Sequence, residues 1–365
     1  MIPLKKKIAV LCGGRSAEHE VSIESAKNVI QCLDKDQYEV NVIFVTCDGQ
    51  WLLLDSIHTI LNNPAMQRLK EPFPAKPLLF QLGHAIPLVI YADNALQPFE
   101  IDLIFPLLHG TYGEDGKLQG LLASANIPYV GSGVLSSAIC MDKEVSKRLL
   151  QQAGIPVAKW ITISRADITT LQFEAVKNEL GLPLFVKPAN AGSSIGISKV
   201  KNEAEFKKAL ALAQQYDSKI LLETYIQGRE IECAVLGNDD VQTSLPGEII
   251  LKTEFYSYEA KYLDIDGAIL NTPAKLAPDI AERIQALAKE AFLVLCCKGM
   301  ARVDFFLTAS GEIFLNEVNT LPGFTQISQY PYMWTVSGLA YPKLLDALIY
   351  LAFTQTPPLW KPHVQ

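Results

Sequence analysis

Apolar and polar residues alternate in blocks along the N-terminal third of the chain, and this pattern predicts an α/β sheet. Short apolar runs are typical of buried strands, and longer segments of mixed polarity predict helices between them. Because strands that alternate with helices form parallel sheets, we expect a parallel sheet here. The expected strands are residues 7–11, 38–45 and 101–108, and the expected helices are residues 18–33 and 116–126.

The connections that follow carry turn and stop signals. Residues 55–76 are rich in Pro and Asn and are expected to form a loop or insertion. Residues 76–90 are expected to form a hairpin that turns near Gly83. A single helix is expected over residues 134–153, because a glycine and then a proline follow it.

After this helix the order of elements changes and predicts a small α+β unit, followed by further strands and helices. Residues 255–272 are polar, aromatic and irregular. We therefore expect α/β and α+β parts in three domains, at residues 1–133, 134–225 and 226–365. The expected strands are residues 159–163, 184–187, 220–224, 230–236 and 244–251, and the expected helices are residues 170–180, 203–215, 277–295 and 341–353.

Composition and charge narrow the class of protein. The 365 residues are 49% hydrophobic and 19% charged, which is ordinary for a globular protein of two or three domains. The net charge of −7 argues against a nucleic-acid partner held by a general basic field. A local positive pocket for nucleotide phosphates remains compatible with this charge.

Cysteine spacing and the lack of a long apolar run favour a soluble cytoplasmic protein. The seven cysteines are odd in number and form no C-x-x-C pair, which argues against zinc and against a disulfide framework. The N-terminal apolar run is short and predicts a strand rather than a signal peptide. No stretch approaches the roughly 18 apolar residues of a membrane span, so we expect no membrane partner.

Two apolar strands near the C-terminal end, RVDFFL and EIFLNEVN, carry an Arg, two carboxylates and an amide. We suppose that Ser310 and Gly311 form the two-residue turn of a hairpin between them. Side chains alternate along a strand, so the polar residues then share one face. The facing pairs are Asp304 with Glu317 and Arg302 with Asn319.

The chemistry of this face points to a nucleotide. Two neighbouring carboxylates repel each other unless a cation joins them or one is protonated. Carboxylate and amide oxygens suit Mg²⁺ or Mn²⁺, and Mg²⁺ takes its remaining ligands from water and phosphate. The alternative is a solvated polar face on an edge hairpin.

Two further stretches could hold the phosphates and the base of a nucleotide. FVKPANAGSSIGISKV places Lys187 at the end of a strand, and a Gly/Ser loop with exposed N–H groups follows. It is not a Walker A sequence, and a plain surface turn is the alternative. ILLETYIQGREIE bends at Gly228, where the backbone could meet an adenine edge while Glu223 accepts from its amino group. Solvated Glu223 and Glu230 are the alternative.

Two N-terminal stretches could hold a small substrate. In LCGGRSAEHEVS a helix begins at Glu18. A helix N-terminus by itself would favour an anionic ligand, but the negative charge of Glu18 opposes one. We therefore expect Glu18 to receive an ammonium group from a substrate. The alternative is stabilisation of the helix dipole by a first-turn Glu. In LLHGTYGEDGKLQG, His109 follows a strand, where α/β folds place ligands, and a structural histidine is the alternative.

Together these stretches resemble the D-alanine–D-alanine ligase family of the ATP-grasp superfamily. The resemblance covers almost the whole chain and rests on motifs in the family's order, namely GGRSAEHEVS, LLHGTYGEDGKLQG, MDKEVSK, VKPANAGSSIG, EFYSYEAKY, ARVDFF and NEVNTLPGFT. It implies a Rossmann-like N-terminal domain and a two-part ATP-grasp fold. It also implies a cytoplasmic homodimer that joins two D-alanines for peptidoglycan, with ATP as co-substrate and two Mg²⁺ or Mn²⁺ ions.

The resemblance also implies a role for each matching residue. The metal ligands would be Asp304, Glu317 and Asn319. The ATP-binding residues would be Lys143, Lys187, Ser193, Ser194, Glu223, Tyr225, Ile226, Glu230, Lys261 and Asn316. The catalytic and substrate-binding residues would be Glu18, His109, Ser193, Tyr262, Arg302, Gly323, Ser328 and Gln329.

Within that set, Glu18 would bind the ammonium of the first D-alanine, and Ser328 the carboxylate of the second. Lys261 and Tyr262 would belong to a lid at about residues 255–272. Tyr225 stands where the family often has Trp.

Gln329 departs from the family, which usually has Leu or Met there, and a polar group beside the second substrate puts the acceptor preference in question. The rival hypotheses are an ATP-grasp ligase for D-lactate, D-serine or another carboxylate–amine pair, and a non-catalytic nucleotide-binding protein. The retained metal ligands and Lys261 argue against the non-catalytic reading.

Overall fold

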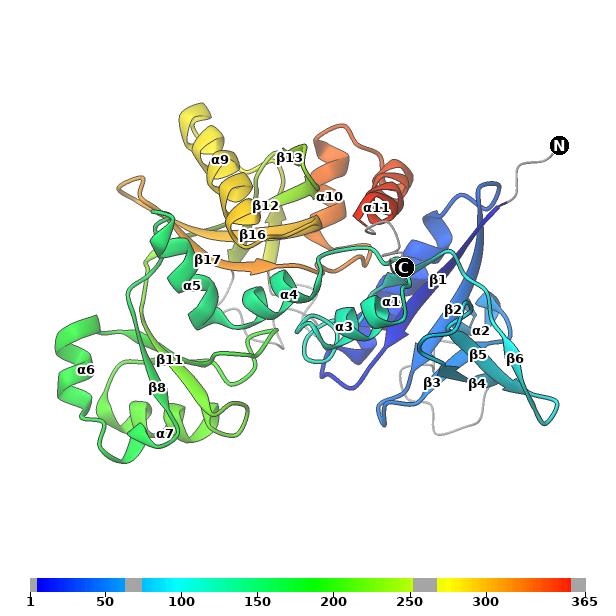
Figure 1. Ribbon diagram of the computed structural model, residues 1–365. Coiled ribbons are helices and arrows are strands. Elements are labelled where there is room, and N and C mark those ends of the chain that lie inside the picture. The colour runs from blue at the N-terminus through cyan, green and yellow to red at the C-terminus, as the bar shows by residue number, and fades with distance from the viewer. Residues whose placement is uncertain (1–4, 63–73, 252–267, 356–365) are drawn as a thin grey trace, which may run out of the picture.

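The computed structural model describes residues 5–62, 74–251 and 268–355, and its strands form three sheets (Figure 1). The first sheet lies in the N-terminal part of the chain, the second in the middle and the third in the C-terminal part. In Figure 1 the first occupies the right of the view, the second the lower left and the third the upper part. The domain boundaries at residues 133 and 225 stay a prediction.

The first sheet is mixed rather than parallel. Its order is β6-β5-β4-β3-β2-β1-β7, and only β1 pairs in parallel, with β2 and β7. The expectation of a parallel sheet is wrong for the other half, where for example β2 and β3 are joined by a turn too short to carry a crossover helix. The elements are β1 Lys6–Gly13, α1 His19–Cys32, β2 Tyr38–Val45, β3 Trp51–Leu54, α2 Ile57–Leu61, β4 Ala75–Phe80, β5 Leu88–Ala92, β6 Ala95–Pro98, β7 Leu103–Pro106 and α3 Lys117–Ser124.

The segment expected to be a loop at residues 55–76 contains regular structure. Helix α2 begins there because the Ser56 hydroxyl accepts a hydrogen bond from the His58 N–H at 3.1 Å and caps it. Strand β4 also begins within it, and residues 63–73 lie outside the described residues. The hairpin expected around Gly83 is confirmed as β4 and β5.

The C-terminal helices α10 (Gln329–Val336) and α11 (Tyr341–Gln355) pack on the first sheet and on α1. The rings of Phe105 on β7 and Phe324 are 5.8 Å apart, and the Asn28 side chain donates to the Phe324 carbonyl at 2.8 Å. This core therefore fixes the loop before α10 against the middle and later turns of α1. Among the described residues no single helix is long and apolar enough to span a membrane; α10 and α11 qualify only as a pair, bent by 109°.

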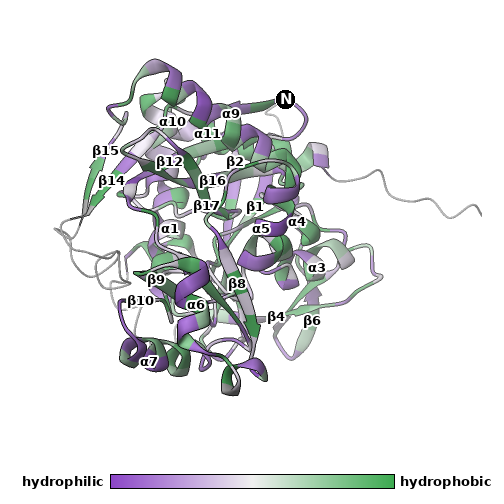
Figure 2. Cartoon of the chain, turned by 90° about the vertical axis from the view of Figure 1, so that its left-hand side faces the viewer, coloured by the Kyte–Doolittle hydropathy of each residue, from purple (hydrophilic) through white to green (hydrophobic). Residues whose placement is uncertain are grey.

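The second sheet has the order β10-β9-β11-β8 and is antiparallel. Its apolar face packs against α6 and α7, whose outer faces are polar, as the mixed purple and green of these helices shows in Figure 2. Because Val186 and Leu222 face these helices and side chains alternate along a strand, Lys187 and Glu223 lie on the opposite face of the sheet. The elements are β8 Trp160–Ser164, the 3₁₀ turn η2 Asp167–Thr169, α6 Phe173–Leu180, β9 Leu184–Pro188, β10 Ser198–Val200, α7 Glu203–Ala213 and β11 Lys219–Thr224.

The third sheet has the order β15-β14-β12-β16-β17, with β13 beside β12, and α9 covers its apolar face. The single strand expected at residues 244–251 is wrong in its first part, because Pro246 has no N–H for a ladder and separates β13 from β14. The elements are β12 Gly228–Gly237, β13 Val241–Thr243, β14 Gly247–Leu251, β15 Ala268–Asn271, α9 Pro278–Val294, β16 Gly299–Thr308 and β17 Ile313–Asn319.

The hairpin of β16 and β17 confirms the expected facing pairs but not the expected turn. The Thr308 N–H donates to the Glu312 carbonyl at 2.9 Å, so three residues form the loop and Gly311 takes the left-handed φ of +84°. That loop alone would set Asp304 opposite Asn316. A β-bulge shifts the register by one residue, so Asp304 faces Glu317 and Asn316 is the extra residue.

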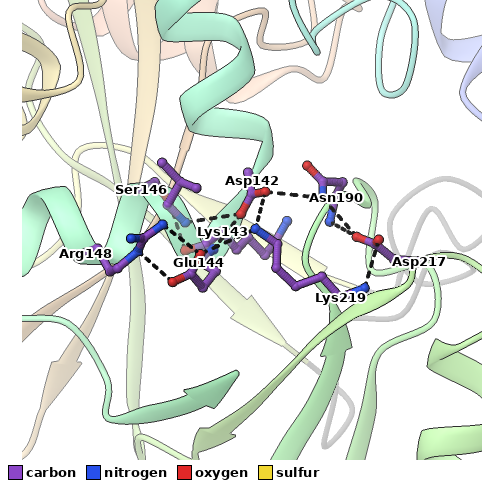
Figure 3. A network of polar contacts seen from close by, with 9 residues as sticks. Asp142, Lys143, Glu144, Ser146, Arg148, Asn190, Asp217 and Lys219 are labelled. Atoms are coloured by element: carbon purple, nitrogen blue, oxygen red, sulfur yellow. Dashed lines mark hydrogen bonds and ion pairs between the residues drawn. The ribbon is translucent and has the colours of Figure 1, made fainter. Parts of the chain in front are cut away.

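The single helix expected over residues 134–153 is two helices, α4 (Val134–Met141) and α5 (Lys143–Gln152). The chain leaves helical geometry at Asp142, with φ −87° and ψ 96°, and its carboxylate accepts the N–H groups of Glu144 at 3.2 Å and Val145 at 3.1 Å. Figure 3 shows the same carboxylate in contact with Lys219 on β11 and with Asn190 in the loop after β9. Asp142 thereby sets the start of α5, where Lys143 lies.

Asp142→Ala is expected to lower the free energy of unfolding by about 1–2 kcal/mol, because it removes a helix cap and the contact with Lys219. Asn202→Ala is the matched control, since Asn202 caps α7 through one bond at an exposed helix start and should cost about 0.5–1 kcal/mol. Urea unfolding monitored by circular dichroism measures both. An unchanged midpoint for Asp142→Ala would contradict the capping role.

Candidate active site

The β16–β17 hairpin presents a charged face in which Arg302 is clamped to Asp304. The guanidinium donates to both carboxylate oxygens, from Nε at 2.8 Å and from Nη2 at 2.7 Å. The Asn319 amide nitrogen donates to the same carboxylate at 3.0 Å. Neighbours in the ladder thus bring together the four residues that the sequence predicts for this face, including Glu317 opposite Asp304.

A third carboxylate, Glu232, belongs to this face and was missed by the sequence reasoning. It lies opposite Asp304 on β12, and its Oε1 is 3.0 Å from Arg302 Nε. Burial disfavours the charged guanidinium, but Asp304 and Glu232 outweigh it and raise the pKa of Arg302 well above its ordinary value. Arg302 therefore stays a cation. The alternation of Glu230 and Glu232 along one predicted strand was the available signal.

The donor set of this face fits a hard divalent cation. Asp304 and Glu317 supply carboxylate oxygens and Asn319 an amide oxygen, with phosphate and water left to complete the coordination of Mg²⁺. No group of three or more His, Cys, Asp and Glu side chains within the described ranges is gathered closely enough to hold a metal. The set therefore depends on the amide and on phosphate oxygens, and a cation must compete with Arg302 for Asp304.

Lys143 connects this face to the Gly/Ser loop after β9. Its Nζ lies 3.4 Å from Glu317 Oε2 and donates to the Ala191 carbonyl at 2.7 Å. The side chain is buried, and it starts from the first residue of α5, which Asp142 caps. Lys143 is thereby held beside a candidate metal ligand and the Gly/Ser loop, an arrangement that suits a phosphate group.

The second candidate cation for phosphate, Lys187, forms part of a buried triad with Glu223 and Lys147. Glu223 Oε1 accepts from Lys187 Nζ at 2.7 Å, and Glu223 Oε2 lies 2.6 Å from Lys147 Nζ. Burial alone would raise the pKa of Glu223, but the two lysines together hold it below its usual value. Lys147 lies in the quoted MDKEVSK motif, four residues after Lys143, yet no role was predicted for it.

The Gly/Ser loop reaches the N-terminal part of the chain through Ser193. Ser193 and Ser194 have φ values of +50° and +59°, which non-glycine residues seldom adopt. The Ser193 hydroxyl donates to the Glu18 carboxylate at the start of α1. A Cβ at Gly110 would lie 2.5 Å from Glu18 Oε2 and displace that carboxylate, and the φ of +71° at this position also favours glycine. The predicted pairing of Glu18 with Ser193 is therefore present.

His109 is buried next to Glu18 but both of its ring nitrogens have protein partners. Nδ1 donates to the Leu321 carbonyl at 3.1 Å, and Nε2 accepts from the Ser25 hydroxyl at 3.2 Å. Burial lowers the pKa of His109, partly offset by Glu18, so the ring is neutral in this arrangement. His109 lines the cavity described below and ties it to the loop before α10.

Glu114, which the sequence reasoning also missed, joins the same two loops. Its carboxyl accepts the N–H groups of Gly110 at 2.6 Å and Leu321 at 3.2 Å. Burial first, and then the neighbouring Glu18, raise the pKa of Glu114 to about 8. The signal was available in LLHGTYGEDGKLQG, where a Glu and an Asp follow a glycine turn.

These side chains open onto one cavity of about 70 Å³ between the three sheets. It is lined by residues of the first sheet's loops, the Gly/Ser loop and the β16–β17 hairpin, including Glu18, His109, Glu114, Ser193, Arg302, Glu317, Asn319 and Gly323. The Glu18 carboxylate and the Arg302 guanidinium therefore line the same small cavity.

The loop between β17 and α10 closes one side of this cavity. A Cβ at Gly323 would lie 2.8 Å from the Ser328 hydroxyl oxygen, so a larger residue there would force Ser328 to move. Ser328 accepts from the Thr325 N–H at 2.9 Å. Gln329, the first residue of α10, is buried and accepts from the Thr272 hydroxyl at 3.0 Å, whereas its Nε2 has no hydrogen-bond partner within the described part of the chain.

The remaining predicted residues lie around the cavity or outside the described ranges. Tyr225 and Ile226 lie between β11 and β12, and the Lys199 ammonium sits 4.1 Å from the centre of the Tyr225 ring. Glu230 lies on β12, and Asn316 is the bulged residue of β17. Lys261, Tyr262 and most of the predicted lid lie outside the described residues.

Two solved structures that resemble this chain over almost its whole length are ligases. The D-alanine–D-alanine ligase from Coxiella burnetii superposes with a TM-score of 0.86 at 43% identity, covering 96% of this chain and 95% of that one. The VanG D-Ala:D-Ser ligase from Enterococcus faecalis gives a TM-score of 0.86 at 38% identity, covering 96% of this chain and 100% of that one. The fold is that of the ATP-grasp ligases.

Sequence relatives narrow the class further. Family models described as the D-ala D-ala ligase N-terminus and C-terminus match residues 7–132 and 149–350. The chain is 49% identical to a D-alanine–D-alanine ligase of Shouchella clausii over 95% of both sequences, and 49% identical to D-alanine–D-alanine ligase A of Escherichia coli over 95% of this chain and 96% of that one. The chain belongs to the D-alanine–D-alanine ligase family.

Glu114→Gln is expected to make the free energy of unfolding fall less steeply with rising pH than it does in wild type. A carboxyl whose pKa is raised to about 8 in the folded chain from 4.5 holds a proton that the unfolded chain releases, so the free energy of unfolding falls between these values. Urea unfolding at pH 5.5 and pH 8 measures the difference, with Glu39→Gln as the control for loss of one exposed carboxyl. Equal slopes in Glu114→Gln and wild type would contradict the raised pKa.

Proposed function

We propose that this protein joins two D-alanines into D-alanyl-D-alanine and converts ATP to ADP and phosphate. The observation that carries the proposal is the shared cavity, which sets the Glu18 carboxylate opposite the Arg302 guanidinium and the oxygen ligands of the hairpin. One wall suits the ammonium of an amino acid. The other suits its carboxylate together with a metal-bound phosphate.

ATP would lie between the second and third sheets. Lys143 and Lys187 would contact its phosphates, with Ser193 and Ser194 in the Gly/Ser loop. Further contacts would come from Asn316 on the hairpin and Lys261. Glu223, Tyr225 and the Ile226 backbone would hold adenine, and Glu230 the ribose.

Asp304, Glu317 and Asn319 would hold two Mg²⁺ or Mn²⁺ ions. When bound, these ions would neutralise the phosphates and favour attack by an anion. Arg302 would turn from Asp304 toward substrate as a cation takes over the carboxylate. The Asn319 amide would also have to present its oxygen rather than the nitrogen that now donates to Asp304.

In the first step, the carboxylate of one D-alanine attacks the γ-phosphate of ATP and gives D-alanyl phosphate and ADP. Both reactants are anions, so Lys143, Lys187 and Arg302 offset their repulsion. Glu18 would orient the ammonium group, and Ser193 fixes the Glu18 carboxylate. His109 holds the loop that closes the site and would exclude water.

In the second step, the neutral amine of another D-alanine attacks the acyl carbon, and phosphate leaves. The oxyanion would form beside Arg302 and the Gly323 N–H. Ser328 would bind the carboxylate of this second substrate, and Tyr262 would join Glu18 and Ser193 as a hydrogen-bonded set. Gln329 would lie near the acceptor.

The acceptor has a second candidate, D-serine, because the VanG D-Ala:D-Ser ligase shares the fold at the same TM-score. D-lactate is the other alternative, although Tyr262 favours a dipeptide product. The product would serve peptidoglycan synthesis. A homodimer and a cytoplasmic location stay predictions, as do the domain boundaries at residues 133 and 225.

Phosphate release from the full chain with ATP and Mg²⁺ tests the proposal, with D-alanine alone, D-alanine plus D-serine, D-alanine plus D-lactate, and L-alanine as separate arms. We expect release with D-alanine alone, matched by D-alanyl-D-alanine in the mass spectrum. Release only with a mixed pair would move the acceptor to D-serine or D-lactate and point to Gln329. No D-alanine-dependent release would contradict the proposal.

A further inference from the structure

The buried triad of Lys147, Glu223 and Lys187 carries more positive than negative charge. Lys147 is 1% exposed, Glu223 3% and Lys187 5%, so water solvates none of these three charges. Two ammonium groups lie within 2.7 Å of one carboxylate, one at each oxygen. The triad as a whole therefore holds one surplus positive charge at the end of β9.

The two lysines differ in what else they can reach. Lys147 starts from the inner face of α5, and its other neighbours are the Ala158 carbonyl at 3.4 Å and the Trp160 ring, whose centre is 5.6 Å away. Lys187 lies near the end of β9, five residues before Gly192 of the Gly/Ser loop that would receive the phosphates. Only Lys187 is thus placed to exchange Glu223 for a phosphate oxygen.

Burial decides what that exchange requires. A carboxylate this deeply buried is costly to leave without a cation, so Lys187 can release Glu223 only if another cation remains on it. Lys147 supplies that cation from the opposite oxygen. Burial lowers the pKa of Lys147, and contact with Glu223 counters that effect, which agrees with a lysine whose charge depends on this one partner.

We propose that Lys147 is a positioning residue that keeps Glu223 neutralised and so frees Lys187 for the phosphates of ATP. This inference rests on the proposed function, because it takes ATP as the ligand. It adds a role that none of the predicted contacts contains, since Lys147 contacts Glu223, the Ala158 carbonyl and the Trp160 ring, and no part in binding ATP or metal was predicted for it. Without Lys147, the attraction of Glu223 would hold Lys187 away from the nucleotide.

The test compares binding of ATP with binding of adenosine to the full chain, by calorimetry with Mg²⁺ and without D-alanine. The ratio of the two affinities reports the phosphates alone. Lys147→Met is expected to lower this ratio about tenfold or more. Lys159→Met is the matched control, because Lys159 is an exposed lysine directly before β8. This change should leave the ratio unchanged.

The double variant Lys147→Met/Glu223→Gln separates positioning from a merely structural role. Removing the Glu223 carboxylate as well takes away the negative charge that would hold Lys187. The ratio of ATP to adenosine affinity should then return to within about threefold of wild type. A single variant with an unchanged ratio would overturn the proposal, as would a double variant that stays as weak as Lys147→Met. If Lys147→Met does not fold, Lys147→Gln is measured in its place with the same expectations.

Failure of this inference is distinguishable from failure of the proposed function. Wild type that binds no ATP would overturn both at once. Wild type that binds ATP, with a normal ratio in Lys147→Met, would overturn only the role of Lys147. A kinetic measurement adds a further distinction, since the variant should raise the KM for ATP more than it lowers kcat.

Discussion

The clamp between Arg302 and Asp304 is the interaction on which the site depends. Three carboxylates, Glu232, Asp304 and Glu317, stand in a row across β12, β16 and β17, and their repulsion is relieved only if a cation lies among them or one of them is protonated. Arg302 supplies that charge from the same face. A divalent cation bound there would neutralise the carboxylates in place of Arg302 and leave its guanidinium able to contact an anionic substrate. Arg302 would thus stabilise the carboxylates without a metal and contact the substrate when a metal is bound.

Sequence pattern predicted most elements, but it failed where one residue or a short connection decided the outcome. The hairpin pairs were predicted correctly although the turn was wrong, because a three-residue loop and the bulge at Asn316 cancel each other. Apolar periodicity does not reveal a bulge, since both sides of it keep their alternation. The break at Asp142 was missed because helical periodicity continues through it. The mixed first sheet was missed because strand direction depends on the connections.

The site residues divide in the same way. Motifs pointed to the residues that touch the cavity, and the structure brings Glu18, Ser193 and Arg302 together there. Lys147 and Glu232 act through other residues, and Glu114 lines the cavity while it holds the loops around it. The sequence contains signals for Glu114 and Glu232, but their burial and the charges that face them come from the fold. Within the described residues, the loops that meet at the cavity come from all three sheets, so long-range packing on α1 and α10 completes it.

Binding of Mn²⁺ in the presence of ADP, followed by electron paramagnetic resonance, tests the central claim that the hairpin face is a metal site. The account predicts that Glu317→Gln loses bound Mn²⁺ and D-alanine-dependent turnover while the protein stays folded. Glu312→Gln, an exposed change at the tip of the same hairpin, should bind Mn²⁺ as wild type does. Equal Mn²⁺ binding by Glu317→Gln and wild type would contradict the metal assignment.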